Sequence, residues 1–442
     1  MWHRIINTLF VIGLLAIIAV GVLYFRLAQS NENILLPAGN EQSMSEYYAE
    51  LLSFEQTDKL PLKDFAPRSN LMVGEHKIQR ARFPVFDAHM PLQDAGMSPE
   101  EVVGLMDSCN IRKIVNLATA SLWGERLAQQ VELYERKYPD RFMTAANIDF
   151  TDSDDPDFST RAVAQLEEAH RLGARAVKIS RTLGLELHDR NNQRIRIDDP
   201  RFAPLWQRAG ELKMPVIMDI AAPTAFWFPV DARNERYEEL QAHLTGQKTR
   251  WGIYGPLFDT VTGAHFKLML LRHPERLYYH SKFKWFEDYF PTKEELLVQR
   301  DSVISRHPQT VFIGAHFGHS AEDLAFVGQE LARYPNYFVD ISQAISELGR
   351  QPFTAREFFI KYQDRIILGL DGKPEIDAYR TAFRFLETTD EYFDYPAAGQ
   401  RPAGCWKIYG LSLPEAVLEK IYYRNAERIF SSETLWLLRR GI

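Results

Sequence analysis

The stretch FPVFDAHMPL, residues 83–92, decides the fold that we expect for this chain. Its apolar residues are typical of a buried β-strand, and it contains Asp87 and His89, whose side chains can bind a metal ion or transfer a proton. Pro91 stands two positions after His89, where a second ligand would share the same face of an extended strand. The stretch therefore predicts a strand that ends at a functional site, and it leaves open whether that site still holds a metal.

Seven further apolar stretches follow, and amphipathic helical segments separate them. The eight predicted strands are residues 83–89, 112–118, 141–148, 174–180, 214–220, 310–316, 336–342 and 365–371. Ser98, followed three residues later by Glu101, is the pattern of a helix capping box, and Gly173 closes another helical segment. Eight strand–helix units over roughly 290 residues are typical of a (β/α)8 TIM barrel, a fold of the α/β class. A doubly wound open sheet is the alternative, but no Gly-rich phosphate turn follows the first predicted strand.

Polar side chains stand at the carboxyl end of most predicted strands. They are Asp87, His89, Lys178, Asp219, His316, Asp340 and Asp371. In a barrel of parallel strands this end is the catalytic face. Because residues i and i+2 of a strand share a face, we expect Asp87 and His89 to point the same way. We expect Asp340 to orient a neighbouring side chain, and His319 and Ser320 to cap the next helix or to face solvent.

The N-terminal segment is apolar. Residues 5–25 contain no charged residue, and these 21 residues would rise about 30 Å as a helix, enough to cross the hydrocarbon core of a membrane. A cleaved signal peptide is the alternative, but Arg26 precedes Ala28 at a position where a cleavage site needs a small residue. We therefore predict a transmembrane anchor over residues 5–25, a linker over 27–80 and the barrel over 82–442, with the barrel on the outer side of the membrane.

The connection between the fifth and sixth predicted strands, residues 221–309, is unusually long. It contains AFWFPVDARNERY, WGIYGPLF and LYYHSKFKWFEDYFP, and is therefore rich in aromatic residues. A connection of this length is expected to fold as a subdomain or arm over the catalytic face. Its aromatic residues either pack against the barrel or a second subunit, which leaves a homodimer open, or form the apolar walls of a lid over a small-molecule substrate.

The composition excludes some classes of function. A formal charge of −7 and a pI near 6.0 give no surplus of Lys and Arg for binding nucleic acid, so nucleic acid is not an expected partner. The two cysteines, Cys109 and Cys405, are too few for a disulfide framework or a cysteine-based zinc site. A globular domain that binds a small molecule is the class that remains.

From residue 83 to about residue 430 the chain resembles the amidohydrolase superfamily, in its amidohydrolase-related (type 2) branch of metal-dependent hydrolases and nonoxidative decarboxylases. The resemblance rests on the order and spacing of FDAHMP, GARAVKIS, MPVIMDIAAP, TVFIGAHFGHSAEDL, NYFVDIS, RIILGLDGKP and IYYRNAERIF. It covers about four fifths of the chain. It implies a TIM barrel, a divalent metal, zinc in the family, and hydrolysis or decarboxylation of a small carbonyl or carboxylate compound.

Carried over residue by residue, the resemblance departs from the family at two metal ligands. The first-strand pattern D-x-H-x-H keeps His89 but has Pro91 in place of its second histidine, and the fifth-strand histidine corresponds to Asp219. The sixth-strand histidine is kept as His316 and the eighth-strand aspartate as Asp371. A site richer in carboxylates shifts the metal preference from zinc toward manganese or magnesium. We therefore predict the metal ligands His89, Asp219 and Asp371 and, with Lys178 added from its place at a strand end, the catalytic residues His316, Asp371 and Lys178.

Each of these residues also has a structural interpretation. His89 could be a core histidine that is hydrogen bonded to Asp87. Lys178 could form an ion pair with Asp219 and so replace the charge of a lost metal. In an active enzyme, Lys178 would instead hold an anionic substrate or polarise its carbonyl group.

Two interpretations of the whole chain remain. The first is a membrane-tethered, metal-dependent hydrolase or decarboxylase of the amidohydrolase type. The second is a degenerate barrel without metal that binds a ligand or acts as a scaffold, with Lys178 or water at the metal position. His316, Asp371 and Lys178 at strand ends favour the enzyme, because a scaffold has no need of them there.

Overall fold

The computed structural model describes residues 69–118, 121–228, 233–237, 239–240, 248–249, 252–253, 291–395, 404 and 406–431. The predicted anchor, residues 5–25, lies outside these residues, as do most of the predicted linker and much of the aromatic connection 221–309. Among the described helices, none has both the length and the apolar character that crossing a membrane requires.

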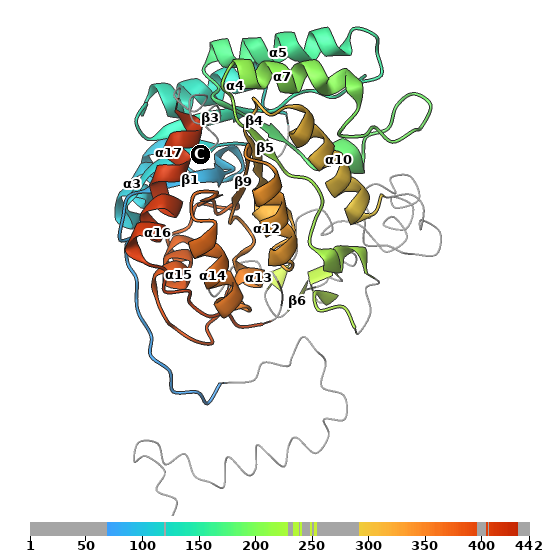
Figure 1. Cartoon of the computed structure of the whole chain (residues 1–442). Helices are drawn as coiled ribbons and strands as arrows, with labels where there is room; N and C mark the ends of the chain where they lie inside the picture. Colours follow the sequence, from blue (N-terminus) through green and yellow to red (C-terminus); the bar gives the residue numbers. More distant parts are fainter. Residues whose placement is uncertain are drawn as a thin grey trace, which may run out of the picture. The chain divides into compact units, whose positions relative to one another are not determined.

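Eight parallel strands form one sheet in the order of the chain (Figure 1). They are β1 (Val85–Met90), β2 (Ile111–Asn116), β3 (Phe142–Ala146), β4 (Ala176–Ile179), β5 (Val216–Met218), β8 (Phe312–Gly314), β9 (Tyr337–Asp340) and β10 (Ile366–Ile367). The sheet closes on itself because the amide of Ala88 donates to the carbonyl of Leu368 and the amide of Asp371 donates to the carbonyl of His89, each over 2.9 Å. The predicted TIM barrel is confirmed, with one strand at each predicted position.

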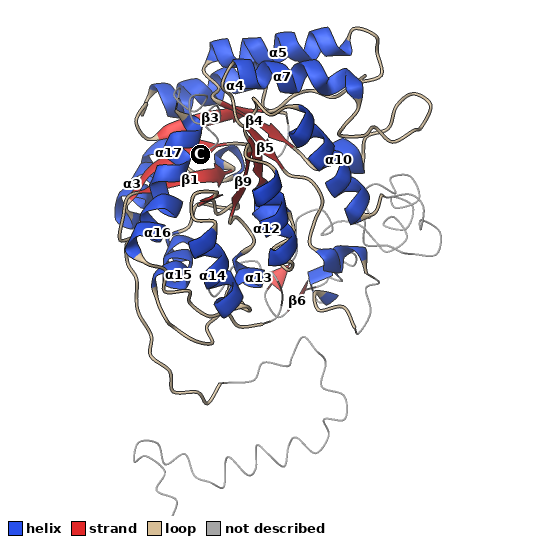
Figure 2. Cartoon of the chain, in the orientation of Figure 1, coloured by secondary structure: helices blue, strands red, loops and turns tan. Residues whose placement is uncertain are grey.

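Helices surround the barrel and connect its strands (Figure 2). The longer ones are α3 (Pro99–Cys109), α4 (Gly124–Gln130), α5 (Phe158–Leu172), α7 (Ala203–Glu211), α10 (Lys293–Arg306), α12 (Leu324–Arg333), α14 (Pro352–Lys361) and α15 (Ile376–Glu387). The shorter elements are η4 (Leu92–Asp94), η5 (Val131–Arg136), α6 (Thr182–Leu185), η6 (Pro200–Phe202), η7 (Thr224–Trp227), α11 (Ala315–Gly318), α13 (Ile345–Gly349), α16 (Glu415–Glu419), η9 (Lys420–Arg424) and α17 (Asn425–Phe430), besides the hairpin of β6 (Lys248–Thr249) and β7 (Gly252–Ile253). The predicted capping box is confirmed at Ser98 and Glu101, and α5 ends at Gly173, whose φ is 127°.

The barrel interior is apolar where the strands begin and polar where they end. One buried cluster takes an inward-facing residue from every strand: Phe86, Val115, Ala145, Ala176, Ile217, Ile313, Phe338 and Ile367. Two positions further along three of these strands stand Lys178, Asp219 and Asp340, and the alternation of side chains turns them inward as well. At the opposite end, α17 covers the barrel, with the rings of Phe430 and Phe86 5.5 Å apart. The carboxyl ends of the strands therefore carry the polar site.

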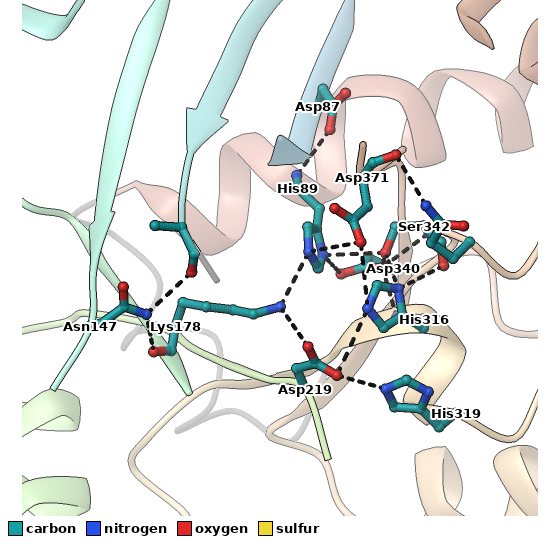
Figure 3. A network of polar contacts seen from close by, with 12 residues as sticks. Asp87, His89, Asn147, Lys178, Asp219, His316, His319, Asp340, Ser342 and Asp371 are labelled. Atoms are coloured by element: carbon teal, nitrogen blue, oxygen red, sulfur yellow. Dashed lines mark hydrogen bonds and ion pairs between the residues drawn. The ribbon is translucent and has the colours of Figure 1, made fainter. Parts of the chain in front are cut away.

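An irregularity in β1 changes which of its residues face the barrel. Between Asp87 and Met90, β1 has one residue more than the paired segment of β2. The Asp87 carboxylate accepts a hydrogen bond from the hydroxyl of Tyr379 on α15 over 2.7 Å, whereas the His89 ring points into the site (Figure 3). The expectation that Asp87 and His89 point the same way is therefore wrong, because the bulge resets the alternation. Asp87 supports His89 by accepting its backbone N–H over 2.9 Å.

The described parts of the long connection pack on the barrel. Arg236 is buried and forms ion pairs with Glu239, over 2.9 Å, and with Glu347 on α13. Its guanidinium lies 5.6 Å from the ring centroid of Phe226 and 5.7 Å from that of Trp406. Because α13 follows β9, this part of the connection contacts the catalytic side of the barrel. The aromatic residues from Trp251 to Phe290 lie outside the described residues, and a lid formed by them stays a prediction.

Two glycines, Gly104 in α3 and Gly210 in α7, test how closely the outer helices pack on the barrel. A Cβ added at Gly104 in α3 meets nothing within 4 Å, whereas at Gly210 in α7 it would lie 2.5 Å from Oγ1 of Thr310 and 3.0 Å from the carbonyl oxygen of Gln309. We expect Gly104→Ala to raise the free energy of unfolding by about 0.5–1 kcal/mol, since alanine is the better helix former. We expect Gly210→Ala to lower it by about 1–3 kcal/mol, since the helix must move. Chemical denaturation measures both, and equal effects at the two positions would contradict the packing of α7.

Candidate functional site

The polar residues at the strand ends lie in one cluster (Figure 3). β1, β4 and β9 and the segments after β5, β8 and β10 contribute one residue each: His89, Lys178, Asp340, Asp219, His316 and Asp371. His89 and Lys178 are buried, whereas 26% of the Asp371 side chain is exposed. All of the predicted site residues are therefore brought to one end of the barrel, and Asp371 lies on the side that solvent reaches.

Asp340 ties three strands together. Its Oδ2 accepts a hydrogen bond from Nδ1 of His89 over 2.9 Å. Its Oδ1 accepts from the backbone amides of His316 and Ser342, each over 3.0 Å, and from the hydroxyl of Ser342. The carboxylate is fully buried, and these four donors replace the water that it has lost. The prediction that Asp340 orients a neighbouring side chain is confirmed for His89.

Hydrogen bonds at the two Nδ1 atoms decide which nitrogen of each imidazole is free. Nδ1 of His89 faces the Asp340 carboxylate, and Nδ1 of His316 faces the carbonyl oxygen of Ser342 over 3.1 Å. Neither oxygen can donate, so each Nδ1 carries the proton. In the neutral form of each ring, Nε2 then presents a lone pair, and the two ring centroids are 5.0 Å apart.

The two Nε2 atoms and the Asp371 carboxylate surround one point. Oδ2 of Asp371 lies 3.9 Å from Nε2 of His89 and 3.7 Å from Nε2 of His316. Donor atoms that bind one ion at about 2.0–2.2 Å can be at most about 4.4 Å apart, so both distances suit a common ion. Two imidazoles and a carboxylate are donors that zinc and manganese both accept. His89, His316 and Asp371 thus fit a divalent cation.

Lys178 approaches the same region from β4. Its Nζ lies 3.2 Å from Nε2 of His89 and 3.6 Å from Oδ2 of Asp219. The predicted ion pair between Lys178 and Asp219 is confirmed. The ammonium group also donates to the lone pair of His89, which the sequence did not predict.

Asp219 is grouped with two histidines. Nε2 of His319 donates to Oδ1 of Asp219 over 2.8 Å, and the same oxygen lies 3.8 Å from Nε2 of His316. The potential ligand atoms of these three residues lie within 4.8 Å of one another. Of the predicted metal ligands, the structure therefore places His89 and Asp371 together, with His316 as the third member, and places Asp219 beside His319.

The turn after β8 brings His319 to Asp219. His316 and His319 have φ values of 56° and 55°, in the left-handed region, and the chain folds back at this point. His319 and Ser320 are buried, and the side chain of Asp323 caps α12 instead. The expectation that His319 and Ser320 cap the helix or face solvent is therefore wrong. The spacing H-x-G-H was the signal that could have revealed the pair.

Left-handed backbone conformations gather around the site. Besides the turn after β8, Ala221, Gln343 and Asp371 have φ values of 79°, 53° and 60°, and they follow β5, β9 and β10. Such conformations cost non-glycine residues about 1–3 kcal/mol each, and they concentrate at active sites and ligand clamps. The fold holds these strand ends in strained positions, which is typical of a functional site.

Burial and nearby charges set the protonation states. Burial would raise the pKa of Asp219, but the Lys178 ammonium and the hydrogen bond from His319 hold that pKa well below its usual value of 3.8. Burial also opposes ionisation of Asp371, yet the neighbouring imidazoles and ammonium keep its pKa below the usual value. Burial lowers the pKa of His319 to about 3 and lowers the pKa of His316 as well. Near pH 7 the two carboxylates are therefore ionised and these two imidazoles are neutral.

Two residues that support the site were not predicted, Ser342 and Asn147. The Ser342 hydroxyl donates to Asp340. Its oxygen lies 3.2 Å from Nδ1 of His89 and 2.9 Å from Nδ1 of His316. The Asn147 amide donates to the carbonyl oxygen of Lys178 over 2.9 Å and so fixes the end of β4. The spacing D-x-S after a strand was the signal for Ser342, and the position directly after β3 was the signal for Asn147.

Residues 126–431, more than half of the chain, match the model of a protein family described as Amidohydrolase. The chain belongs to the amidohydrolase family. Lys178, Asp219, His316 and Asp371 fall within the matched residues of this amidohydrolase, whereas β1 with His89 precedes them. No curated protein matches the chain.

Several solved structures are similar to this amidohydrolase at low identity. One is 2,6-dihydroxybenzoate decarboxylase from Rhizobium, at 17% identity, 79% of this chain, 98% of that chain and a TM-score of 0.43. A second is a dihydroxybenzoic acid decarboxylase from Polaromonas sp. JS666 with bound manganese and an inhibitor. It is 16% identical, the match covers 79% of this chain and 97% of that chain, and the TM-score is 0.43. A third is an uncharacterized TIM-barrel protein from Bordetella bronchiseptica. It is 16% identical, the match covers 78% of this chain and 98% of that chain, and the TM-score is 0.43. Likeness at this level says nothing about the substrate of this chain.

The Asp340 network predicts a large and specific loss of stability. Asp340→Ala leaves the buried donors of His89, His316 and Ser342 without their acceptor, and should lower the free energy of unfolding by about 3–5 kcal/mol. Ser342→Ala, the control, removes one hydroxyl and should cost about 1 kcal/mol. Chemical denaturation at pH 7 compares them, and an Asp340→Ala variant as stable as Ser342→Ala would contradict the network.

The hydrogen bonds of Asp340 also predict how the free energy of unfolding changes with pH. Burial opposes ionisation of Asp340, but its contact with His89 and its hydrogen bonds hold its pKa well below the usual 3.8. The stability gained from this carboxylate is therefore complete above about pH 3.8 and is lost as the pH falls further. The difference in unfolding free energy between Asp340→Ala and the wild type should shrink between pH 5 and pH 3, and a difference that grows would contradict the assignment.

Proposed function

We propose that this amidohydrolase is a metal-dependent hydrolase of a small ester or amide that carries a carboxylate. The observation that carries the proposal is the convergence of the Nε2 lone pairs of His89 and His316 on the Asp371 carboxylate. Imidazoles whose Nδ1–H donates to a carboxylate or a carbonyl are the usual arrangement of metal-binding histidines.

His89, His316 and Asp371 would hold the cation. A divalent ion there supplies a Lewis acid that polarises a carbonyl oxygen and lowers the pKa of a bound water. Zinc is the ion implied by the family resemblance, and two imidazoles with one carboxylate also suit manganese. Because 26% of the Asp371 side chain is exposed, a small molecule would approach the cluster from that side.

Asp219 and Lys178 would orient the attacking water and bind the charge of the substrate. Asp219 is ionised, and the hydrogen bond from His319 holds it in place, so it can accept a hydrogen bond from the attacking water. The Lys178 ammonium would bind the carboxylate of the substrate. Hydrolysis is the reaction that we propose, because an ionised carboxylate beside the cation site can orient water for attack on a carbonyl carbon, and nonoxidative decarboxylation is the alternative that the family resemblance implies.

A barrel without metal that binds an anionic ligand is the second candidate. One observation favours it: Nζ of Lys178 lies 3.2 Å from Nε2 of His89 and already uses the lone pair that a cation would need. In that case the protein would hold no divalent ion, and Lys178 would bind the anion.

Metal analysis and chelation test the proposed hydrolase. We expect about one equivalent of a divalent ion in the purified protein. EDTA treatment should abolish the hydrolysis of a panel of carboxylate-bearing esters and amides, and Mn²⁺ or Zn²⁺ should restore it.

Asp371→Asn should lower kcat/KM at least about 100-fold, because it weakens the cation site. Asp364→Asn, at an exposed aspartate paired with Lys420, is the matched control. Turnover that ignores both EDTA and Asp371→Asn would contradict metal-dependent hydrolysis, and release of CO₂ from aromatic carboxylates would identify decarboxylation.

We also propose that residues 5–25 anchor the protein in a membrane, with the barrel on the outer side. The support is the run of 21 uncharged residues between Arg4 and Arg26. The full chain should stay in the membrane fraction through high-salt and alkaline washes, because burial of apolar residues does not depend on charge. A variant that lacks residues 1–26 should be released with the same metal content. A full chain that appears in the supernatant would contradict the anchor.

A further inference from the structure

We propose that Lys178 is an exchangeable counter-ion: in the metal-free protein its ammonium group takes the place of the cation at His89, and a divalent metal binds by displacing it toward Asp219. This inference rests on the proposed metal site and adds a means of regulating it. The site then carries a resident positive charge in both states.

His89 can serve one partner at Nε2. Its Nδ1 hydrogen is donated to Asp340 over 2.9 Å, so Nε2 offers a single lone pair. That lone pair faces Nζ of Lys178 at 3.2 Å. A metal ion and an ammonium N–H cannot share one lone pair, and their like charges repel at such a separation. Binding of metal and the contact between Lys178 and His89 are therefore mutually exclusive.

The charges around Lys178 require a cation whether or not metal is present. Asp219 and Asp340 are buried and Asp371 is partly buried, and each carboxylate lies within 3.9 Å of an imidazole nitrogen. Buried carboxylates without a positive partner strongly destabilise a fold. Lys178, of which 3% is exposed, supplies a positive charge among them, and Arg181 acts on Asp219 as well. The metal-free site is therefore neutralised in part by the chain itself.

Asp219 offers the displaced ammonium group a second partner. Its Oδ2 lies 3.6 Å from Nζ of Lys178, longer than a hydrogen bond. Its Oδ1 is held by His319 over 2.8 Å, so the carboxylate is already oriented. The lysine side chain has flexible bonds, and a small rotation shortens the contact with Asp219 while it lengthens the contact with His89. Exchange therefore needs no movement of the barrel.

Two consequences follow for the whole protein. The wild-type chain should stay folded after chelation, because Lys178 returns to His89 and keeps the site neutralised. Its affinity for a divalent ion should also be lower than the same ligands would give without Lys178, since the state that can bind metal is only part of the population.

Lys178→Met tests the exchange, because methionine keeps the unbranched apolar stem and removes the charge. We titrate the metal-free full chain with Mn²⁺ alone and follow the EPR signal of the free ion. The affinity for Mn²⁺ should be at least about tenfold higher in Lys178→Met than in the wild type. The Tm in excess EDTA should fall below that of the wild type and rise again with Mn²⁺. Lys178→Gln, a polar replacement, gives a second removal of the charge and should show the same gain in affinity.

Lys293→Met is the matched control. Lys293 is a second buried lysine, on α10, and its Nζ forms an ion pair with Glu322 over 2.6 Å and a hydrogen bond with Thr224. Removing this charge should lower the Tm, because Glu322 loses its partner. The affinity for Mn²⁺ should stay at the wild-type value, because neither partner belongs to the metal site.

The outcomes separate this inference from the proposed function. Tight Mn²⁺ binding that is equal in wild type and Lys178→Met, or weaker in the variant, would overturn the inference and leave the hydrolase proposal standing. Binding in Lys178→Met alone would support the inference and remove metal-dependent hydrolysis from the wild-type protein. Absence of binding in the wild type and in both Lys178 variants would overturn both.

Discussion

The buried carboxylate of Asp340 is the constraint on which the site depends. It accepts from the ring of His89 on β1, from the backbone amide of His316 after β8, and from Ser342 after its own strand. Because it requires a proton on Nδ1 of His89, it leaves the Nε2 lone pair of that ring facing the centre of the barrel mouth. Asp340 touches neither substrate nor metal in this account, yet it determines what His89 can bind.

The balance of charge decides what the barrel mouth can do. Asp219 and Asp371 are ionised beside Lys178, while burial keeps His316 neutral. Such a site attracts cations. The ammonium group of Lys178 is one cation already there, with its Nζ 3.2 Å from Nε2 of His89. Whether metal or ammonium occupies this position separates a hydrolase from a barrel that binds anions, so Lys178 links the two candidate functions.

Where strand alternation is regular, the sequence was sufficient to predict the site. Ala176 and Lys178 on β4, and Ile217 and Asp219 along β5, show how a pattern of period two places polar residues at the barrel mouth. The prediction was wrong for Asp87, because the extra residue in β1 depends on pairing with β2 and not on local sequence. The position of His319 was missed for a similar reason, since left-handed backbone after β8 is imposed by the folded environment.

The claim that His89, His316 and Asp371 hold a divalent cation is tested most directly by a crystal structure of the protein grown with Mn²⁺, measured at a wavelength where manganese scatters anomalously. We expect one anomalous peak about 2.0–2.2 Å from Nε2 of both imidazoles and from a carboxylate oxygen of Asp371. We also expect Nζ of Lys178 to have left His89 for Asp219. A map without that peak, with the ammonium group of Lys178 still on His89, would contradict a divalent cation at these three residues.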